Sequence, residues 1–508
     1  MIAVSNLSAR RSGLVRPWLV TFVALAVAAT SATAGHARSG PANAPLTDLD
    51  SFVDGVMAQQ IASREVAGAV VTVVADGKML FSRGYGMADI DKNGAVDGLT
   101  TLVRPGSISK MFTWIALLQQ VEQGRVDLDA DVNRYIDFRI EPFQGQPIRV
   151  RDLLSHSPGL SDVGNVATTD PAKVVPYEQW LKQRVPARLW PPGTEISYSN
   201  WGAALAGYIV ERVSGEPFAD YAEKHILAPL GMTSSTFREP LGPPMANRMA
   251  TGYKLVDGRF VAQPVEFLAP VMPAGSLTAS GPDLARFMLA LINDGALGKT
   301  RIASRASIAL LESNSLANAP DLPPMAHGFL VYRQQNPRLV GHAGKTIGFS
   351  SDLIYAPDRG IGFFVSTTGG KDSGKARTEL SQALVGRLFP TTLAPRYTGD
   401  ETPPLGVYRV NRRDYAEEAT PAYDLIVSQP TPHRLTIETD GVKTAWDQIG
   451  PHLYEKVTGA RLGGPFEQIQ FYNNTLGARL SYASQPFMTY RLIEARRPVA
   501  ELPSGNRP

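Results

Sequence analysis

Apolar residues recur at helical spacing in three parts of the chain. Between residues 49 and 61 they return every three or four positions, which predicts an amphipathic helix. Between residues 107 and 124 they cover nearly every side of a predicted helix, at Met111, Phe112, Trp114, Ile115, Leu117, Leu118 and Val121. Such a helix is expected in the middle of a domain, because every face needs apolar neighbours. Residues 148 to about 291 are predicted to be mostly helical.

Strand-like runs lie on both sides of this helical region. Residues 69–75 and 78–82 flank Asp76-Gly77, which is a strong β-hairpin signal. Further strands are predicted at residues 328–333, 353–356 and 361–367, before a helix at 376–388. The pattern predicts an α+β domain over residues 45–390. Its antiparallel sheet is built from both ends of the domain and flanked by helices, with a mainly helical subdomain inserted between.

The predicted secondary structure changes after residue 390. Four prolines, at positions 390, 395, 403 and 404, predict a linker over residues 391–404. About eight short strands separated by turn residues then follow within residues 405–496. That density of strands predicts a small antiparallel barrel or sandwich as a second domain.

The first 34 residues have the pattern of a secretory signal peptide. Three arginines precede an apolar run from Trp18 to Ala29, and Ala32-Thr33-Ala34 supplies a small-residue cleavage site. A membrane anchor is the alternative, but the apolar run is short for a span. The sequence therefore predicts a periplasmic or secreted protein without a stable membrane anchor.

Composition narrows the range of partners and chemistries. The formal net charge of +3 comes from the three arginines of the predicted signal peptide, so nothing indicates nucleic acid as a partner. The chain has no cysteine, which excludes disulfides and thiol catalysis. The seven histidines form no His-Glu-x-x-His motif, so neither a metal nor another cofactor is expected.

Candidate chemistry is carried by three short patterns. In chain order they are Ser107-Ile108-Ser109-Lys110, Tyr198-Ser199-Asn200 and His342-Ala343-Gly344. Residues three apart on a helix share a face, so Lys110 is expected beside Ser107. A lysine buried in an apolar helix is desolvated, and its pKa falls toward the range in which it accepts a proton. It could then activate the serine hydroxyl, which is otherwise a poor nucleophile.

Tyr198 and Asn200 extend this arrangement. The tyrosine could share the proton transfer if a cation holds its phenolate, and the amide of Asn200 could orient Lys110 or a substrate. Gly106 leaves the N-terminus of the predicted helix open, where free N–H groups could stabilise an oxyanion. His156, in the run Leu-Leu-Ser-His-Ser, is interpreted as a structural histidine.

Together these motifs resemble those of the serine β-lactamase and penicillin-binding-protein superfamily, on the side of class C β-lactamases, DD-peptidases, D-aminopeptidases and esterases. The resemblance runs from about residue 48 to 390. Besides the three patterns it includes residues 106–128 and 148–160, Pro192-Gly193, residues 229–232, and Gly275-Ser276 ahead of Asp283-Leu284. The tail from about residue 405 resembles the lipocalin-like barrel appended to some of these hydrolases.

The resemblance implies roles for the matching residues. Ser107 would be acylated, and Lys110 and Tyr198 would share general acid–base duty. The backbone N–H groups of Ser107 and Lys345 would form the oxyanion hole. The pattern that begins at His342 would lie on the edge strand lining the site. The residues implied to bind substrate are Asn200, His342, Gly344 and Lys345.

One departure from the family pattern shapes the expected function. Dedicated β-lactamases of this type have Lys-Thr-Gly where this chain has His342-Ala343-Gly344, so a permanent charge that would hold a substrate carboxylate is missing. Efficient β-lactam turnover is therefore not expected, although acylation by penicillins stays open. Histidine is common at that position among the family's DD-peptidases, D-amino-acid peptidases and esterases.

The expected function is an exported serine hydrolase that acts through an acyl-enzyme on amide or ester bonds of small peptides or related compounds. A peptidase is the first interpretation, an esterase the second and a weak β-lactamase the third. The non-enzyme alternative is a catalytically silent binding protein that presents a barrel. The sequence leaves the oligomeric state open.

Overall fold

The computed structural model describes residues 46–164, 166–370, 373–390, 397–399, 401–457 and 468–496. The predicted signal peptide lies outside these residues, as does part of the predicted linker. No helix among the described residues combines the length and hydropathy of a membrane span.

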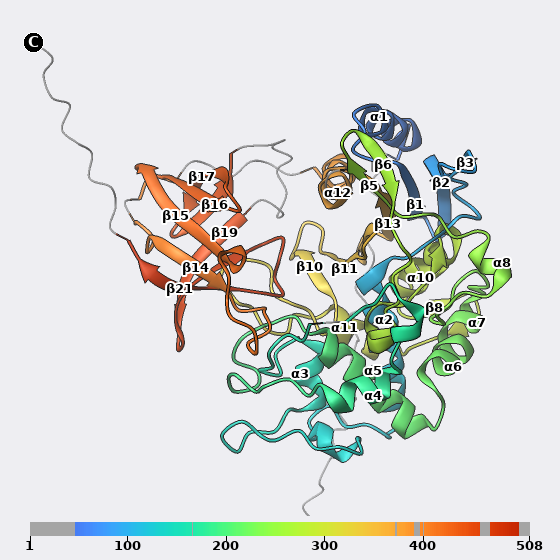
Figure 1. Ribbon diagram of the computed structural model, residues 1–508, viewed down its shortest axis with the longest axis horizontal. Helices are drawn as coiled ribbons and strands as arrows, with labels where there is room; N and C mark the ends of the chain where they lie inside the picture. Colours follow the sequence, from blue (N-terminus) through green and yellow to red (C-terminus); the bar gives the residue numbers. More distant parts are fainter. Residues whose placement is uncertain are drawn as a thin grey trace, which may run out of the picture. The chain divides into compact units, whose positions relative to one another are not determined.

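The first domain is built on one antiparallel sheet, in the order β10-β11-β12-β13-β1-β2-β3 (Figure 1). Strands β1 and β13 pair from Gly68 with Thr368 to Val74 with Gly362, so the sheet joins the two ends of the domain as predicted. The strands are β1 (Gly68–Ala75), β2 (Lys78–Asp89), β3 (Gly94–Ala95), β10 (Leu330–Arg333), β11 (Leu339–Lys345), β12 (Ser350–Ala356) and β13 (Ile361–Thr368).

Helices cover both faces of this sheet, and the alternation along β1 shows why. Val71 and Val73 point into one apolar cluster with α1 and α12, whereas Val70 and Val74 point into another with α2 and α10. The helices are α1 (Leu49–Ala62), α2 (Ser109–Glu122), α3 (Val150–Leu154), α4 (Tyr177–Gln183), α5 (Asn200–Ser214), α6 (Phe218–Ala222), α7 (Ala228–Leu230), α8 (Pro243–Ala246), α9 (Met272–Gly275), α10 (Gly281–Ile292), α11 (Arg305–Glu312) and α12 (Ser373–Leu388).

Three short strand pairs complete the first domain. Their strands are β4 (Leu102–Val103) with β7 (Ala279–Ser280), β5 (Tyr253–Val256) with β6 (Arg259–Ala262), and β8 (Ala296–Leu297) with β9 (Thr300–Arg301). The first pair is important for the site, because β4 leads directly into the segment that carries Ser107.

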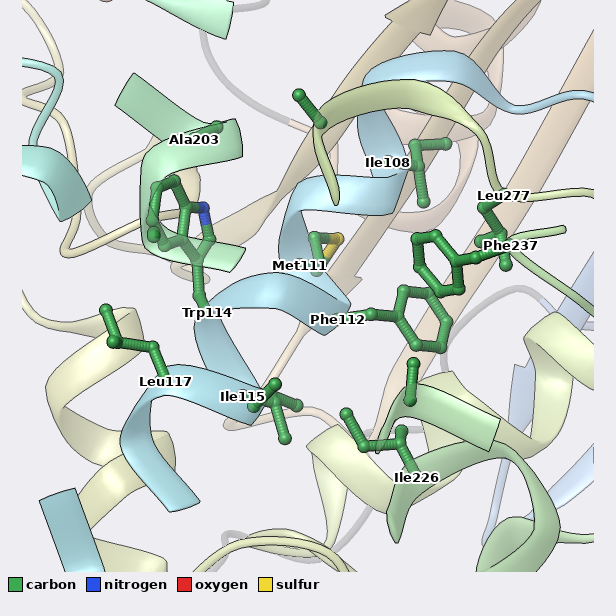
Figure 2. Packing of buried hydrophobic residues seen from close by; sticks show 14 of the residues in the cluster. Ile108, Met111, Phe112, Trp114, Ile115, Leu117, Ala203, Ile226, Phe237 and Leu277 are labelled. Carbon is green, nitrogen blue, oxygen red and sulfur yellow. The ribbon is translucent and has the colours of Figure 1, made fainter. Parts of the chain in front are cut away.

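Helix α2 is buried on nearly all sides, as its sequence predicts. The ring of Phe112 stacks on Phe287 of α10, with 3.9 Å between ring centroids. Figure 2 shows Phe112 and Trp114 leaving opposite sides of α2, with Phe112 toward Phe237 and Trp114 toward Ala203 of α5. Such packing fixes the helix, and with it the direction of the side chains in its first turn.

Shortening one α2 side chain is expected to weaken the domain slightly. Ile115 is fully buried, and Ile115→Val removes one methylene from a closely packed core. We expect a loss of about 1 kcal/mol in the free energy of unfolding, measured by urea denaturation. The exposed Val442→Ala change serves as the control. A stability equal to that of the unmodified protein would contradict this packing.

The second domain is a closed antiparallel barrel of eight strands, β14 to β21, drawn in orange to red in Figure 1. The strands are β14 (Gly406–Val410), β15 (Asp424–Thr431), β16 (Arg434–Thr439), β17 (Val442–Gly450), β18 (Leu453–Lys456), β19 (Gln468–Asn474), β20 (Gly477–Tyr482) and β21 (Tyr490–Ala495). β14 pairs with both β15 and β21, which closes the barrel. Large side chains, including Tyr408, Tyr454 and Phe471, pack inside it. The predicted barrel is thus confirmed.

Two details of the predicted strands are wrong. β11 is not the edge strand, because β10 forms a hairpin with it on its outer side. β10 has only four residues and pairs with residues 339–341, so it does not reach the half of β11 from His342 to Lys345. The strand-like sequence pattern predicts the last barrel strand over residues 487–494, but this strand begins at Tyr490, because residues 487–489 form a loop.

Candidate active site

Ser107 lies in a tight turn between β4 and α2. Gly106 adopts φ +59°, and residues 106–108 form one 3-10 turn before α2 begins. A side chain at Gly106 would lie 2.9 Å from the backbone nitrogen of Lys345, so only glycine permits this approach to β11. The Ser109 hydroxyl donates to the Gly106 carbonyl at 2.6 Å and fastens the turn to the helix.

Lys110 is the most buried cation of the site. Its side chain is fully buried, and Nζ lies 3.1 Å from Ser107 Oγ, 2.8 Å from Asn200 Oδ1 and 2.8 Å from the Ala274 carbonyl oxygen. Burial lowers the pKa of Lys110 well below its usual value, and the nearby Arg412 guanidinium lowers it further. A neutral amine would donate its two N–H groups to the two carbonyl oxygens. Its lone pair would then face the serine hydroxyl.

Tyr198 lies between aromatic neighbours beside Lys110. Its ring centroid is 4.3 Å from that of His156, 5.3 Å from that of Phe487 and 4.7 Å from Lys110 Nζ. Burial raises the pKa of Tyr198, and the Ser107 hydroxyl and the Arg412 guanidinium act in the opposite direction without cancelling it. Tyr198 is therefore a neutral phenol near pH 7.

Asn200 begins helix α5, which explains how its side chain is aimed. Ser199 caps that helix by accepting the Gly202 N–H at 2.9 Å, and the Ser199 N–H donates to Nδ1 of His156 at 3.3 Å. Asn200 thus leaves the first turn of a fixed helix and reaches Lys110. His156, which the sequence identifies only as structural, supports the segment that carries both Tyr198 and Asn200.

The half of β11 that β10 leaves uncovered completes the site. His342 is buried, its Nδ1 lies 2.5 Å from the Ala343 carbonyl oxygen, and burial lowers its pKa to about 3. Its ring is therefore neutral near pH 7. A side chain at Gly344 would lie 1.8 Å from the Pro105 carbonyl oxygen and 2.9 Å from the Ser107 nitrogen. Glycine at 344 thus lets β11 lie against the turn that carries the serine.

The predicted catalytic and substrate-binding residues line one cavity of about 950 Å³, apart from Lys110, whose side chain is fully buried. The barrel supplies part of the wall. The residues that the barrel and its loops contribute to the lining of this cavity are Arg412, Val442, Lys443, Thr444, Lys456, Gln485 and Phe487. Arg412 and Phe487 could not be inferred from the sequence, because each lies in a loop more than 200 positions along the chain from its partner Tyr198. A second cavity, of about 740 Å³ around Arg104, contains none of the predicted site residues.

Metal ligands do not gather in the described part of the chain, where no three His, Asp or Glu side chains are grouped as an ion would need. The residues around Ser107 supply a candidate nucleophile, a buried lysine whose pKa is lowered, a phenol and a close backbone approach that glycines permit. Such parts carry out acyl transfer without a metal or cofactor.

The fold and the site are those of an α+β protein with a Ser-x-x-Lys pair. A buried helix carries the pair at a cleft beside the sheet. Residues 52–386 match the family described as Beta-lactamase. This match covers well over half of the 508 residues, and the chain belongs to that family.

Among curated relatives, Protein flp of Staphylococcus aureus (strain MW2) is 25% identical over 329 residues, which are 63% of this chain and 63% of that protein. The chain thus spans less than two thirds of the length of this relative. The octameric penicillin-binding protein homologue from Pyrococcus abyssi superposes with a TM-score of 0.60 at 21% identity, over 87% of this chain and all of the other. D-amino acid amidase from Ochrobactrum anthropi SV3 gives a TM-score of 0.56 at 25% identity, over 67% of this chain and 97% of the amidase.

Family and neighbours together support a function of the serine-hydrolase type. The likeness to the Pyrococcus protein concerns the fold alone.

Proposed function

We propose that this protein is an exported serine hydrolase that forms an acyl-enzyme on Ser107, acting on amide or ester bonds of small peptides or related compounds. The observation that carries the proposal is the position of Lys110: Nζ lies 3.1 Å from Ser107 Oγ on a fully buried side chain. Burial lowers the pKa of Lys110 and so favours its action as a base toward the serine hydroxyl, and general base catalysis contributes on the order of 10² to 10⁴-fold.

The proposed reaction has two halves. Ser107 Oγ attacks the substrate carbonyl carbon while Lys110 takes the hydroxyl proton, and the N–H groups of Ser107 and Lys345 stabilise the oxyanion. The carbonyl then re-forms as the bond to the leaving group breaks. The departing amine or alkoxide takes a proton, which Tyr198 donates as a neutral phenol, and the ammonium of Lys110 restores the tyrosine proton. Water next attacks the ester carbonyl carbon on Ser107 and gives a proton to the same pair. The bond from that carbon to Ser107 Oγ then breaks, the pair returns the proton to Oγ, and the acid leaves.

Peptidase or amidase activity is favoured over esterase activity, and β-lactam turnover ranks third. Support for an amide substrate comes from the 25% identical neighbour, which is named a D-amino acid amidase. His342 is neutral where dedicated β-lactamases have lysine, so β11 offers no fixed charge at this position to a β-lactam carboxylate. We include export in the proposal because of the signal-like residues 1–34, and the periplasm or cell exterior is the proposed location.

A substrate panel tests the proposal. The purified protein would be assayed with p-nitrophenyl acetate and butyrate, D- and L-alanyl anilides, acyl-D-Ala-D-Ala peptides and nitrocefin, with and without prior treatment by a fluorophosphonate. We expect turnover of at least one amide or ester, inhibition by the fluorophosphonate, and little turnover of nitrocefin. No turnover together with no covalent labelling would overturn the hydrolase and favour the silent binding protein.

A further inference from the structure

Two loops of the barrel reach the segment that carries Tyr198. The Tyr198 N–H donates to the carbonyl of Phe487 at 2.9 Å, and the Asn411 side-chain amide donates to the carbonyl of Ile196 at 2.8 Å. Phe487 belongs to the loop before β21, and Asn411 follows β14. The backbone leading into the tyrosine is thus bonded to the barrel at two points, at the Ile196 carbonyl and the Tyr198 N–H, and not only to the domain that contains it.

The loop after β14 also brings a cation to the tyrosine. Arg412 Cζ lies 4.7 Å from the centre of the Tyr198 ring, which is within cation–π range. Arg412 Nε donates to Asp162 Oδ2 at 3.1 Å, and its side chain is about one quarter exposed. The guanidinium lines the same cavity as Ser107. It therefore lies against the acid–base pair and not on the outer surface of the barrel.

We propose that Arg412 is a positioning residue supplied by the barrel: it holds the Tyr198 ring and places a fixed positive charge beside the Lys110–Tyr198 pair. The barrel is then a working part of the active site and not an appended domain. This inference rests on the proposed function, because it concerns the pair that activates Ser107.

The charged groups around the pair determine the direction in which Arg412 shifts the pKa values of Lys110 and Tyr198. Arg412 lowers the pKa of both Lys110 and Tyr198, and Asp162 acts in the opposite direction on both. The other titratable groups that face the pair are neutral near pH 7, because burial lowers the pKa of the histidines and raises that of the tyrosine. These groups are His156, His342 and Tyr332. Arg412 and Asp162 thus shift the pKa values of both members of the pair in opposite directions.

Removing the cation should make Ser107 harder to activate. Without Arg412 the pKa of Lys110 rises, so a smaller fraction of the amine is neutral at a given pH. Arg412→Gln is expected to slow fluorophosphonate labelling of Ser107 at pH 7 by roughly 3- to 10-fold, which corresponds to the Coulomb effect of one partly exposed charge. The rising limb of the rate–pH curve should move to higher pH, so that the deficit shrinks in alkaline solution.

The experiment measures labelling rates from pH 5 to 10 in the full protein and in four variants. Arg412→Lys keeps the charge and should restore most of the rate. Asp162→Asn removes the opposing charge and should move the limb to lower pH. Arg434→Gln removes an arginine from an exposed barrel pair and should behave as the unmodified protein. Melting curves by circular dichroism check that each variant is folded.

The outcomes separate this inference from the proposed function. A rising limb of Arg412→Gln that coincides with that of the unmodified protein would overturn the inference, as would a rate loss that is equal at every pH. If Arg412→Gln fails to fold, the direction of the Asp162→Asn shift decides, and a shift to higher pH or none counts against the inference. Absence of labelling in the unmodified protein would refute the hydrolase proposal itself.

Discussion

Ser107→Ala is expected to lower kcat/KM by on the order of 10⁴ to 10⁶-fold, because removal of a nucleophile abolishes the covalent route and leaves only binding and oxyanion stabilisation. The fold should be unaffected, since the Ser107 side chain is only partly buried and its backbone turn is held by Gly106 and Ser109. Initial rates on the preferred substrate of the panel measure the loss. Ser63→Ala, on the surface at the end of α1, is the matched control and should keep full activity.

Lys110 extends the same prediction. Lys110→Met keeps the length of the side chain and removes the base, so we expect a loss of about 10² to 10⁴-fold. If the two residues act as one unit, the double variant Ser107→Ala/Lys110→Met is no slower than Ser107→Ala alone. Losses that multiply in the double variant would show that Lys110 acts separately from the serine. A Ser107→Ala variant with more than a few per cent of normal activity would contradict the mechanism.

Breaking the buried ion pair between the two domains is expected to cost about 3 to 5 kcal/mol in the free energy of unfolding. Arg479 Nε of β20 donates to Glu195 Oε1 at 2.7 Å, and each side chain is only 3% exposed. Glu195→Leu leaves a buried guanidinium without its counter-charge, and Arg479→Leu leaves a buried carboxylate without its own. Uncompensated buried charges are among the most destabilising changes in proteins.

A double-mutant cycle by urea denaturation measures this prediction. Glu195→Leu combined with Arg479→Leu should recover most of the lost stability, because both charges are then removed together. Because Glu195 lies three residues before Tyr198, the single variants should also lower activity through the same segment. The exposed pair Arg434–Asp447 in the barrel is the control, and its loss should cost less than about 1 kcal/mol. Single variants at Glu195 and Arg479 as stable as that control would contradict the account.

The sequence predicts most of the fold, because its main elements carry strong local signals. The all-round apolar pattern of 107–124 predicts the buried helix α2, and Asp76-Gly77 predicts the hairpin between β1 and β2. Eight runs of strand-like residues predict a barrel that the structure shows to be closed. The position of β11 could not be inferred in the same way. The pairing of β11 with the four residues of β10 depends on contacts across the sheet, which the local periodicity of the sequence does not reveal.

In the candidate site, too, the sequence predicts the features that depend on local patterns and not those that depend on tertiary contacts. Lys110 beside Ser107 follows from helical spacing, and the lowered pKa of Lys110 follows from the apolar helix around it. The contacts of Tyr198 with Arg412 and Phe487 do not follow, since no local pattern indicates which barrel loop meets which segment of the first domain. An arginine after a strand is most simply interpreted as a surface residue. Only the tertiary structure places it in the wall of the candidate active site.

The most direct measurement of the central claim is the mass of the protein during turnover. The unmodified protein and Ser107→Ala would be mixed with a p-nitrophenyl ester, quenched in acid within the first turnovers, and digested for peptide mapping. We predict one acyl group on the peptide that contains Ser107, located at that residue by fragmentation, and no adduct in the variant. Steady turnover without an adduct on Ser107, at a rate that Ser107→Ala does not diminish, would contradict the acyl-enzyme mechanism and with it the assignment of this cleft.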